Sequence, residues 1–173
     1  MYEQYASPYT KESRFAGWSM TKTVTSALVG IRAGQGKASI DDKGAAIAPE
    51  WGHDANDTRA ELSVSTLLRM SSGLEFAEVY SKLSVTDVAA MLFQHHDSGE
   101  YAAASRQAHP ADTHWAYSSG TTNLLSRYLR STFANDGGDE AYWQFPYRAL
   151  FAPLGMYSAV MEVRPLRRCR LRC

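Results

Sequence analysis

SMTKTVTSALVGIRA, residues 19–33, is the stretch of this 173-residue sequence that decides the fold. Its apolar residues recur at helical spacing, which predicts an amphipathic helix packed against a core from Ser19 to about Ala33. Gly34 and Gly36 follow and end the pattern. We therefore expect Ser19 to stand at the beginning of this helix. The apolar residues of the pattern are Met20, Val24, Ala27, Leu28 and Ile31.

Ser19 and Lys22 form the single S-x-x-K sequence in the chain. Residues three apart in a helix share one face, so the hydroxyl and the amine are predicted to be neighbours. A serine hydroxyl needs an adjacent base to act as a nucleophile. Lysine can supply that base where burial disfavours its ammonium form. The N–H groups at a helix N-terminus can also stabilise an oxyanion, so the pair indicates acyl-transfer chemistry.

The composition is that of one globular domain with a substantial core. No apolar stretch reaches the length of a membrane span. The N-terminus lacks the basic start and apolar run of a signal peptide, so the chain as written is expected in the cytoplasm, whereas an intact parent protein could be periplasmic. The formal net charge is zero, and no nucleic-acid or membrane partner is expected.

The last ten residues, 164–173, differ from the rest of the chain. They hold five Arg and no acidic residue, together with Cys169 and Cys173, the two cysteines of the sequence. Two cysteines make neither a disulfide framework nor a four-ligand zinc site. We interpret residues 164–173 as a tail that is disordered or translated in a shifted frame, with a salt-dependent nucleic-acid arm as the alternative.

The rest of the chain is predicted to be mainly helical. Residues 94–113 are polar and irregular, with Gly99 and Pro110 as turn signals. We expect a short strand over 2–9 and helices over 63–70, 84–93, 119–133 and 139–151.

Tyr117-Ser118-Ser119 precedes the predicted helix of residues 119–133. A phenol near an ammonium group has its phenolate favoured, so Tyr117 and Lys22 could share one proton and activate Ser19. The structural alternative makes Tyr117 an aromatic anchor and Ser118 or Ser119 a helix cap.

Three motifs in this order resemble those of the serine β-lactamase-related family: GWSMTK at 17–22, LLRMSSGL at 67–74 and YSSG at 117–120. The family includes penicillin-binding DD-peptidases, class C β-lactamases, esterases and 6-aminohexanoate-dimer hydrolases. The resemblance runs from about Glu3 to Glu162. Its Tyr-Ser-Ser form is most similar to the 6-aminohexanoate-dimer hydrolase branch.

The resemblance implies an α+β fold of the β-lactamase/DD-peptidase type, of which residues 1–163 hold a partial domain: mostly the helical subdomain, with few strands of the antiparallel sheet. It implies that Ser19 is the acylated nucleophile, Lys22 its base partner and Tyr117 a proton shuttle. Ser119 and Trp18 would contact substrate. The expected substrate is a small ester or amide, and no cofactor or metal is implied.

One family motif is missing after Tyr117. Members carry Lys-Thr-Gly or His-x-Gly on a strand beside the nucleophile, where it supplies half of the oxyanion hole. We therefore expect a truncated fragment of a larger serine hydrolase whose activity is impaired. The alternative is a catalytically inactive fragment, or a module that binds penicillin or a peptide. The sequence leaves the oligomeric state open.

Other candidate sites in the sequence have simpler interpretations. Residues 17–21 nearly match the G-x-S-x-G nucleophile elbow, but Thr21 replaces the last glycine. The four histidines between residues 95 and 114 have no metal-site spacing and are interpreted as a polar surface loop. Glu75 and Glu78 flank Phe76 after a glycine and could face the cleft, but they are interpreted as solvated loop acids.

Overall fold

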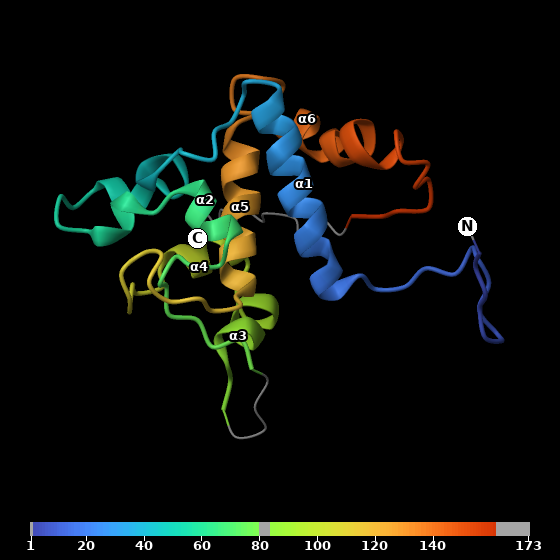
Figure 1. The fold of residues 1–173 in the computed structure, drawn as a ribbon, viewed down its shortest axis with the longest axis horizontal. Helices are drawn as coiled ribbons and strands as arrows, with labels where there is room; N and C mark the ends of the chain where they lie inside the picture. Colours follow the sequence, from blue (N-terminus) through green and yellow to red (C-terminus); the bar gives the residue numbers. More distant parts are fainter. Residues whose placement is uncertain (1, 80–83, 162–173) are drawn as a thin grey trace, which may run out of the picture.

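Two helices form the centre of the computed structural model, which describes residues 2–79 and 84–161. Helix α1 (Thr21–Gly34) and helix α5 (Ser119–Ser131) lie side by side (Figure 1). A 3-10 turn, η1 (Trp18–Met20), leads into α1, so the predicted helix begins where the apolar pattern begins. The predicted tail, residues 164–173, lies outside the described residues.

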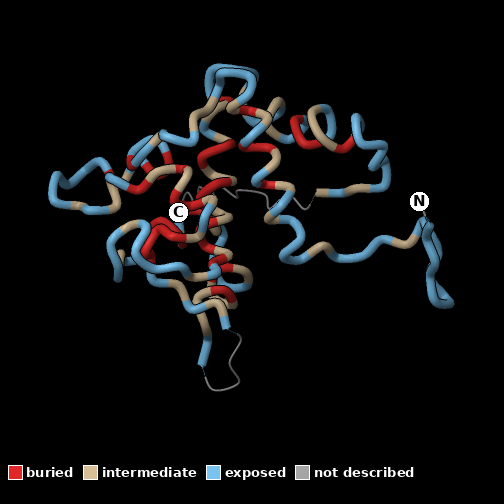
Figure 2. Tube along the Cα trace, viewed as in Figure 1, coloured by how far each residue is buried: buried red, intermediate tan, exposed pale blue. Residues whose placement is uncertain are grey.

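Helix α5 contributes six buried residues to the fold, more than any other helix in the described part of the chain (Figure 2). Its apolar residues recur at i, i+1, i+4 and i+5, which places them on one face toward the core. Ser118 caps the helix, because its hydroxyl accepts the backbone N–H of Thr121 at 3.2 Å. The buried face consists of Leu124, Leu125, Tyr128 and Leu129.

Arg32 ties the C-terminal end of α1 to the end of α5. Its side chain is only 4% exposed and donates to the backbone oxygen of Thr132 at 2.8 Å and to Asp136 at 2.7 Å. The guanidinium also lies 3.8 Å from the ring centre of Phe133, which is cation–π geometry. A buried cation is tolerated here because its donors and its flat face all have partners.

Short helices surround this pair. Helix α2 (Val64–Leu68) begins at Ser63, where a reciprocal capping box with Thr66 fixes the start. Helices α3 (Asp87–Phe93) and α4 (Ser98–Ala103) pack against α5. Helix α4 lies where the sequence predicted irregular structure: its six residues are too few for a periodic signal, and the Asp97 cap starts it.

The chain between α1 and α2 runs through three 3-10 turns, η2 (Gly44–Ala46), η3 (Pro49–Gly52) and η4 (Thr58–Glu61). Trp51 anchors them in the core: its ring is fully buried and its indole N–H donates to the oxygen of Ala103 at 2.9 Å.

The last predicted helix divides in two. Helix α6 (Gly138–Pro146) ends at Pro146, and a π-helical turn, η5 (Tyr147–Phe151), continues the chain. Proline removes a backbone donor and crowds the preceding turn, which explains the change of winding.

The expected sheet is not found among the described residues, which contain two isolated bridges, Lys43 with Ser63 and Leu74 with Gln107. The strand predicted over 2–9 is wrong: this segment forms no ladder and leads away from the helical body (Figure 1). Its polar–aromatic alternation fits a strand, but a strand needs a partner for its backbone groups. The described residues are therefore mostly helical, which is compatible with the expected helical subdomain.

Candidate active site

The predicted pairing of Ser19 and Lys22 is present in the structure. Ser19 lies in η1 and Lys22 in the first turn of α1, and Lys22 Nζ donates to Ser19 Oγ at 3.3 Å. Ser19 is exposed, whereas Lys22 is half-buried. The local geometry of one helical turn brings the hydroxyl and the amine together, as the spacing predicted.

Trp18 immediately precedes the serine and has an unusual backbone. Its φ is +42°, in the left-handed region that bulky residues rarely occupy, and its side chain is 71% exposed. Such a conformation costs on the order of 1–3 kcal/mol and is concentrated at functional sites in proteins. The turn therefore presents both Ser19 and a large indole to solvent.

The start of α5 brings the second predicted motif to the same place. Lys22 Nζ donates to Ser119 Oγ at 2.9 Å and lies 4.7 Å from the ring centre of Tyr117. The cap of α5 is Ser118 rather than Ser119, which leaves the Ser119 hydroxyl available to face Lys22. Residues separated by about a hundred positions thus meet around one amine.

The environment of Tyr117 favours its phenolate. Partial burial acts to raise the pKa of Tyr117, but hydrogen bonding with Ser19 and Lys22 and the positive charge of Lys22 act in the other direction. The net result is a pKa below the ordinary tyrosine value. A lower pKa increases the fraction of phenolate at a given pH, and the phenolate is the form that can accept a proton from a neighbouring hydroxyl.

Glu78 is the residue that the sequence interpretation missed. It was predicted to be a solvated loop acid, but it is half-buried and both of its oxygens bind Ser119. Oε1 accepts the Ser119 hydroxyl at 2.6 Å, and Oε2 accepts the Ser119 backbone N–H at 2.7 Å. Its position before α3 carries no periodic signal, so only the fold reveals it.

The middle motif, residues 67–74, holds the segment that leads to Tyr117. The oxygen of Met70 accepts the N–H of Ala116 at 3.0 Å, and Ser71 Oγ donates to Asp112 at 2.7 Å. Gly73 is required for this packing: its φ is +74°, and a Cβ there would lie 2.0 Å from the His109 oxygen. This motif supports the site rather than contributing to it.

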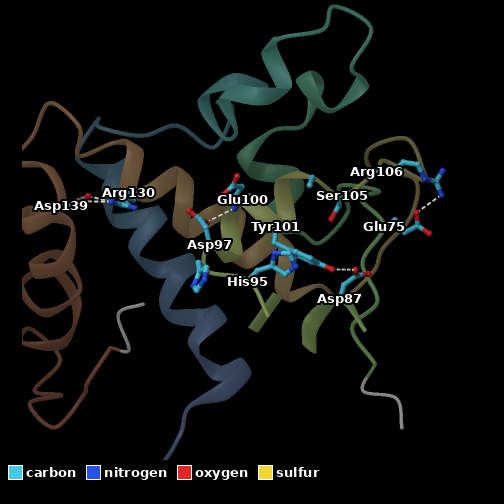
Figure 3. A pocket seen from close by; sticks show the side chains of 12 residues that line it. Glu75, Asp87, His95, Asp97, Glu100, Tyr101, Ser105, Arg106, Arg130 and Asp139 are labelled. Atoms are coloured by element: carbon cyan, nitrogen blue, oxygen red, sulfur yellow. Dashed lines mark hydrogen bonds and ion pairs between the residues drawn. The ribbon is translucent and has the colours of Figure 1, made fainter. Parts of the chain in front are cut away.

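A cavity of about 1350 Å³ lies elsewhere, lined by residues of the loop before α3, of α3 and α4, and of the α5–α6 region (Figure 3). None of its lining residues belongs to the cluster around Lys22. Its charged groups are largely engaged with one another: Glu75 pairs with Arg106 at 2.7 Å, and Asp87 accepts the hydroxyl of Tyr101 at 2.7 Å. Its charged side chains are thus paired with one another, whereas the cluster around Lys22 places an amine beside an exposed serine, and that cluster is the better candidate for chemistry.

The histidines do not gather into a metal site. Within residues 2–79 and 84–161, no group of three or more His, Cys, Asp or Glu side chains could hold a metal ion. His109 and His114 stack on each other with ring centres 4.3 Å apart, and His95 packs against Tyr101.

The geometry of Ser19, Lys22 and Tyr117 fits the class of proteins in which a lysine and a phenol surround a serine hydroxyl. A family model described as Beta-lactamase matches residues 1–170, and the chain therefore belongs to the beta-lactamase family. Membership of this family points to serine-hydrolase chemistry, in agreement with the motifs.

The fold is also similar to a solved one. The structure of a "putative beta-lactamase" from Bacteroides dorei DSM 17855 superposes with a TM-score of 0.58 and 20% sequence identity. The match covers 79% of this chain and 37% of that chain, so this sequence spans little more than a third of it. No curated protein matches the sequence. In the part of the chain that the structure describes, no helix is long and apolar enough to cross a membrane.

Proposed function

We propose that this protein is, or is part of, a serine hydrolase that cleaves an ester or amide through an acyl-enzyme intermediate on Ser19. The observation that carries the proposal is the position of Lys22 Nζ, which lies within hydrogen-bond distance of both Ser19 and Ser119 and beside the Tyr117 ring. This arrangement supplies a nucleophile, a cation and a proton acceptor in one cluster.

The proton route follows from the pKa of Tyr117. Ser19 Oγ attacks the substrate carbonyl while its proton passes to the phenolate of Tyr117, and the ammonium of Lys22 stabilises the charge between the two oxygens. The phenol then protonates the leaving alcohol or amine as the tetrahedral intermediate collapses. Water reverses these steps to release the acid and free Ser19. Lys22 thus acts with Tyr117 as base partner, and Tyr117 shuttles the proton.

The proposed substrates are short esters or small linear amides, as in the 6-aminohexanoate-dimer hydrolase branch that the Tyr-Ser-Ser motif resembles. Trp18 and Trp115 are large and exposed; Trp18 directly precedes Ser19, and Trp115 stands two residues before Tyr117. Trp18 would contact the acyl chain, and Ser119 would contact its polar part. A panel of nitrophenyl esters, a chromogenic cephalosporin and a D-Ala-D-Ala peptide tests this ranking, and preferential turnover of the cephalosporin overturns it.

A fluorophosphonate probe tests the nucleophile directly. We expect the probe to label the protein at Ser19, with mass-spectrometric mapping of the adduct, and Ser19→Ala to abolish the labelling. Ser26→Ala is a matched control, because Ser26 is an exposed serine on α1, the helix that follows Ser19. Labelling at another serine, or equal labelling of Ser19→Ala, contradicts the assignment.

A second candidate function is binding without turnover. The described residues place no sheet strand beside Ser19, and such a strand carries the second oxyanion donor in the enzymes that the motifs resemble. Loss of one oxyanion donor costs about 2.7–4 kcal/mol in the transition state. A chain of this kind would bind a penicillin or a peptide analogue but release no product, so saturable binding without hydrolysis favours this alternative.

A further inference from the structure

We propose that Glu78 is a positioning residue, which acts through the Ser119 hydroxyl to hold Lys22 toward Ser19. The inference rests on the proposed function, because it gives Glu78 a part in activating the same serine. Glu78 binds Ser119 and not the nucleophile itself, so its influence passes through its neighbour.

The direction of the hydrogen bonds carries the argument. A serine hydroxyl has one proton to donate and two lone pairs that accept. Ser119 gives its proton to Glu78 Oε1 at 2.6 Å, so it can only accept from Lys22, whose Nζ lies 2.9 Å away. An ionised carboxylate has no proton to donate and can only accept. It therefore fixes the direction of both hydrogen bonds, from Lys22 to Ser119 and from Ser119 to Glu78. The ammonium of Lys22 is left with a defined orientation and a further proton to share with Ser19.

The residue that precedes Glu78 is held through both of its backbone polar groups. The N–H of Ala77 donates to Asp87 at 2.7 Å, and the Ala77 oxygen accepts from Val88 at 3.2 Å. Asp87 is itself held by the hydroxyl of Tyr101 at 2.7 Å. These contacts hold the backbone just before Glu78, and the two hydrogen bonds of its carboxylate with Ser119 orient the side chain without a substrate.

The charges of Glu78 and Lys22 also favour this arrangement. The groups that face Tyr117 and Lys22 are the hydroxyls of Ser19 and Ser119 and the carboxylate of Glu78. A carboxylate one hydroxyl away from the ammonium balances its charge at a half-buried position. The simpler interpretation is that Glu78 only caps the first turn of α5, where a negative charge is favourable. The experiment must therefore separate a capping role from a positioning role.

Glu78→Gln keeps the size of the side chain and removes its charge, and Glu75→Gln is the matched control in the same loop, since Glu75 pairs with exposed Arg106 instead. The readout is the rate of fluorophosphonate labelling at Ser19 across pH. We expect Glu78→Gln to lower the plateau rate at least tenfold. Burial and the Glu78 charge both act to raise the pKa of Tyr117, so this variant also moves the rising limb to lower pH.

The control Glu75→Gln is expected to label within twofold of the unmodified protein with an unchanged profile. A Glu78→Gln protein that behaves like this control overturns the proposal. A loss of rate with the pH profile unmoved also overturns it, because the charge of Glu78 would then have no influence on Tyr117. If Glu78→Gln does not fold, Ser119→Ala replaces it, since that variant removes the bridging hydroxyl and keeps the capped backbone N–H.

A second measurement keeps the two proposals distinguishable. If the unmodified protein is not labelled at Ser19, the proposed function fails, and Glu78 is then tested by the acetylation rate of Lys22 with acetic anhydride. We expect Lys22 to react at least threefold faster in Glu78→Gln, because the amine is released, while exposed Lys43 keeps its rate. An equal Lys22 rate in both proteins overturns the positioning role whatever the outcome at Ser19.

Discussion

Replacing Gly120 with alanine places a methyl group against the ring of Phe76. A Cβ at this position would lie 2.7 Å from Phe76 Cδ2 and 2.8 Å from Cε2, closer than carbon atoms can pack. Phe76 belongs to the loop that carries Glu78, and its ring rests on the first turn of α5. The substitution must therefore push the loop away from the helix or move the helix itself.

The magnitude follows from two opposed effects. Alanine in place of glycine in a helix gains at most about 1 kcal/mol, whereas overpacking of this kind costs about 1–3 kcal/mol. Gly30 gives the matched control, because it is exposed in the middle of α1 and a Cβ there would meet no atom within 4 Å. Gly30→Ala is expected to gain about 0.5–1 kcal/mol.

Thermal and urea unfolding of the two variants provide the measurement. We expect their unfolding free energies to be separated by about 1–3 kcal/mol, which corresponds to roughly 2–12 °C in Tm for a chain of this size. We also expect Gly120→Ala, but not Gly30→Ala, to slow labelling of Ser19, because the displaced loop takes Glu78 with it. Equal stability of the two variants would refute the contact between Phe76 and α5, and with it the reasoning on the loop.

Three further predictions concern tyrosines. Tyr128→Phe removes a hydroxyl that donates to Asp42 at 2.5 Å and accepts the Ser39 N–H at 2.9 Å. We expect this variant to have a free energy of unfolding in urea that is lower by about 1–3 kcal/mol. An unchanged free energy argues against this hydrogen-bond network. The pKa of Tyr117 is expected below the ordinary tyrosine value of about 10. The difference between the ultraviolet titration curves of the unmodified protein and Tyr117→Phe measures this pKa. Burial and the Asp42 hydrogen bond raise the pKa of Tyr128 to about 12. The unfolded chain therefore ionises first, and the stability that Tyr128 contributes below pH 10 should be lost as the pH rises toward 12; a flat stability profile over that interval contradicts the assignment.

The sequence predicted those helices that carry a local signal, such as an apolar period or a capping residue. The apolar period of residues 19–33 and the Ser63 cap identified α1 and α2, and both are confirmed. Helix α4 escaped because it has six residues and no apolar period. The strand over 2–9 was wrong because alternation states only that one side of a segment is apolar, whereas a strand also needs a neighbouring chain.

The residues of the candidate site also divide into those that a local sequence signal predicted and those that it did not. Spacing alone placed Lys22 beside Ser19, since one helical turn fixes their separation. The meeting with Tyr117 and Ser119 depended on the family resemblance, because nothing local indicates that α5 begins beside α1. Glu78 had neither kind of signal: its role depends on a loop that contacts two other segments, and only the assembled fold defines it.

The contacts of Arg32 with Thr132 and Asp136 lie at the opposite end of α1 from Ser19. Ser19 and Lys22 belong to one continuous turn of chain, so their distance is maintained even if α1 separates from α5. Tyr117 and Ser119 reach them only while the two helices are docked, and Arg32 is the best-bonded part of that docking. The site thus depends partly on local helix geometry and partly on tertiary packing. Slow opening of the helix pair at the Arg32 end would separate Lys22 from Tyr117 and Ser119, and would inactivate Ser19 without moving it.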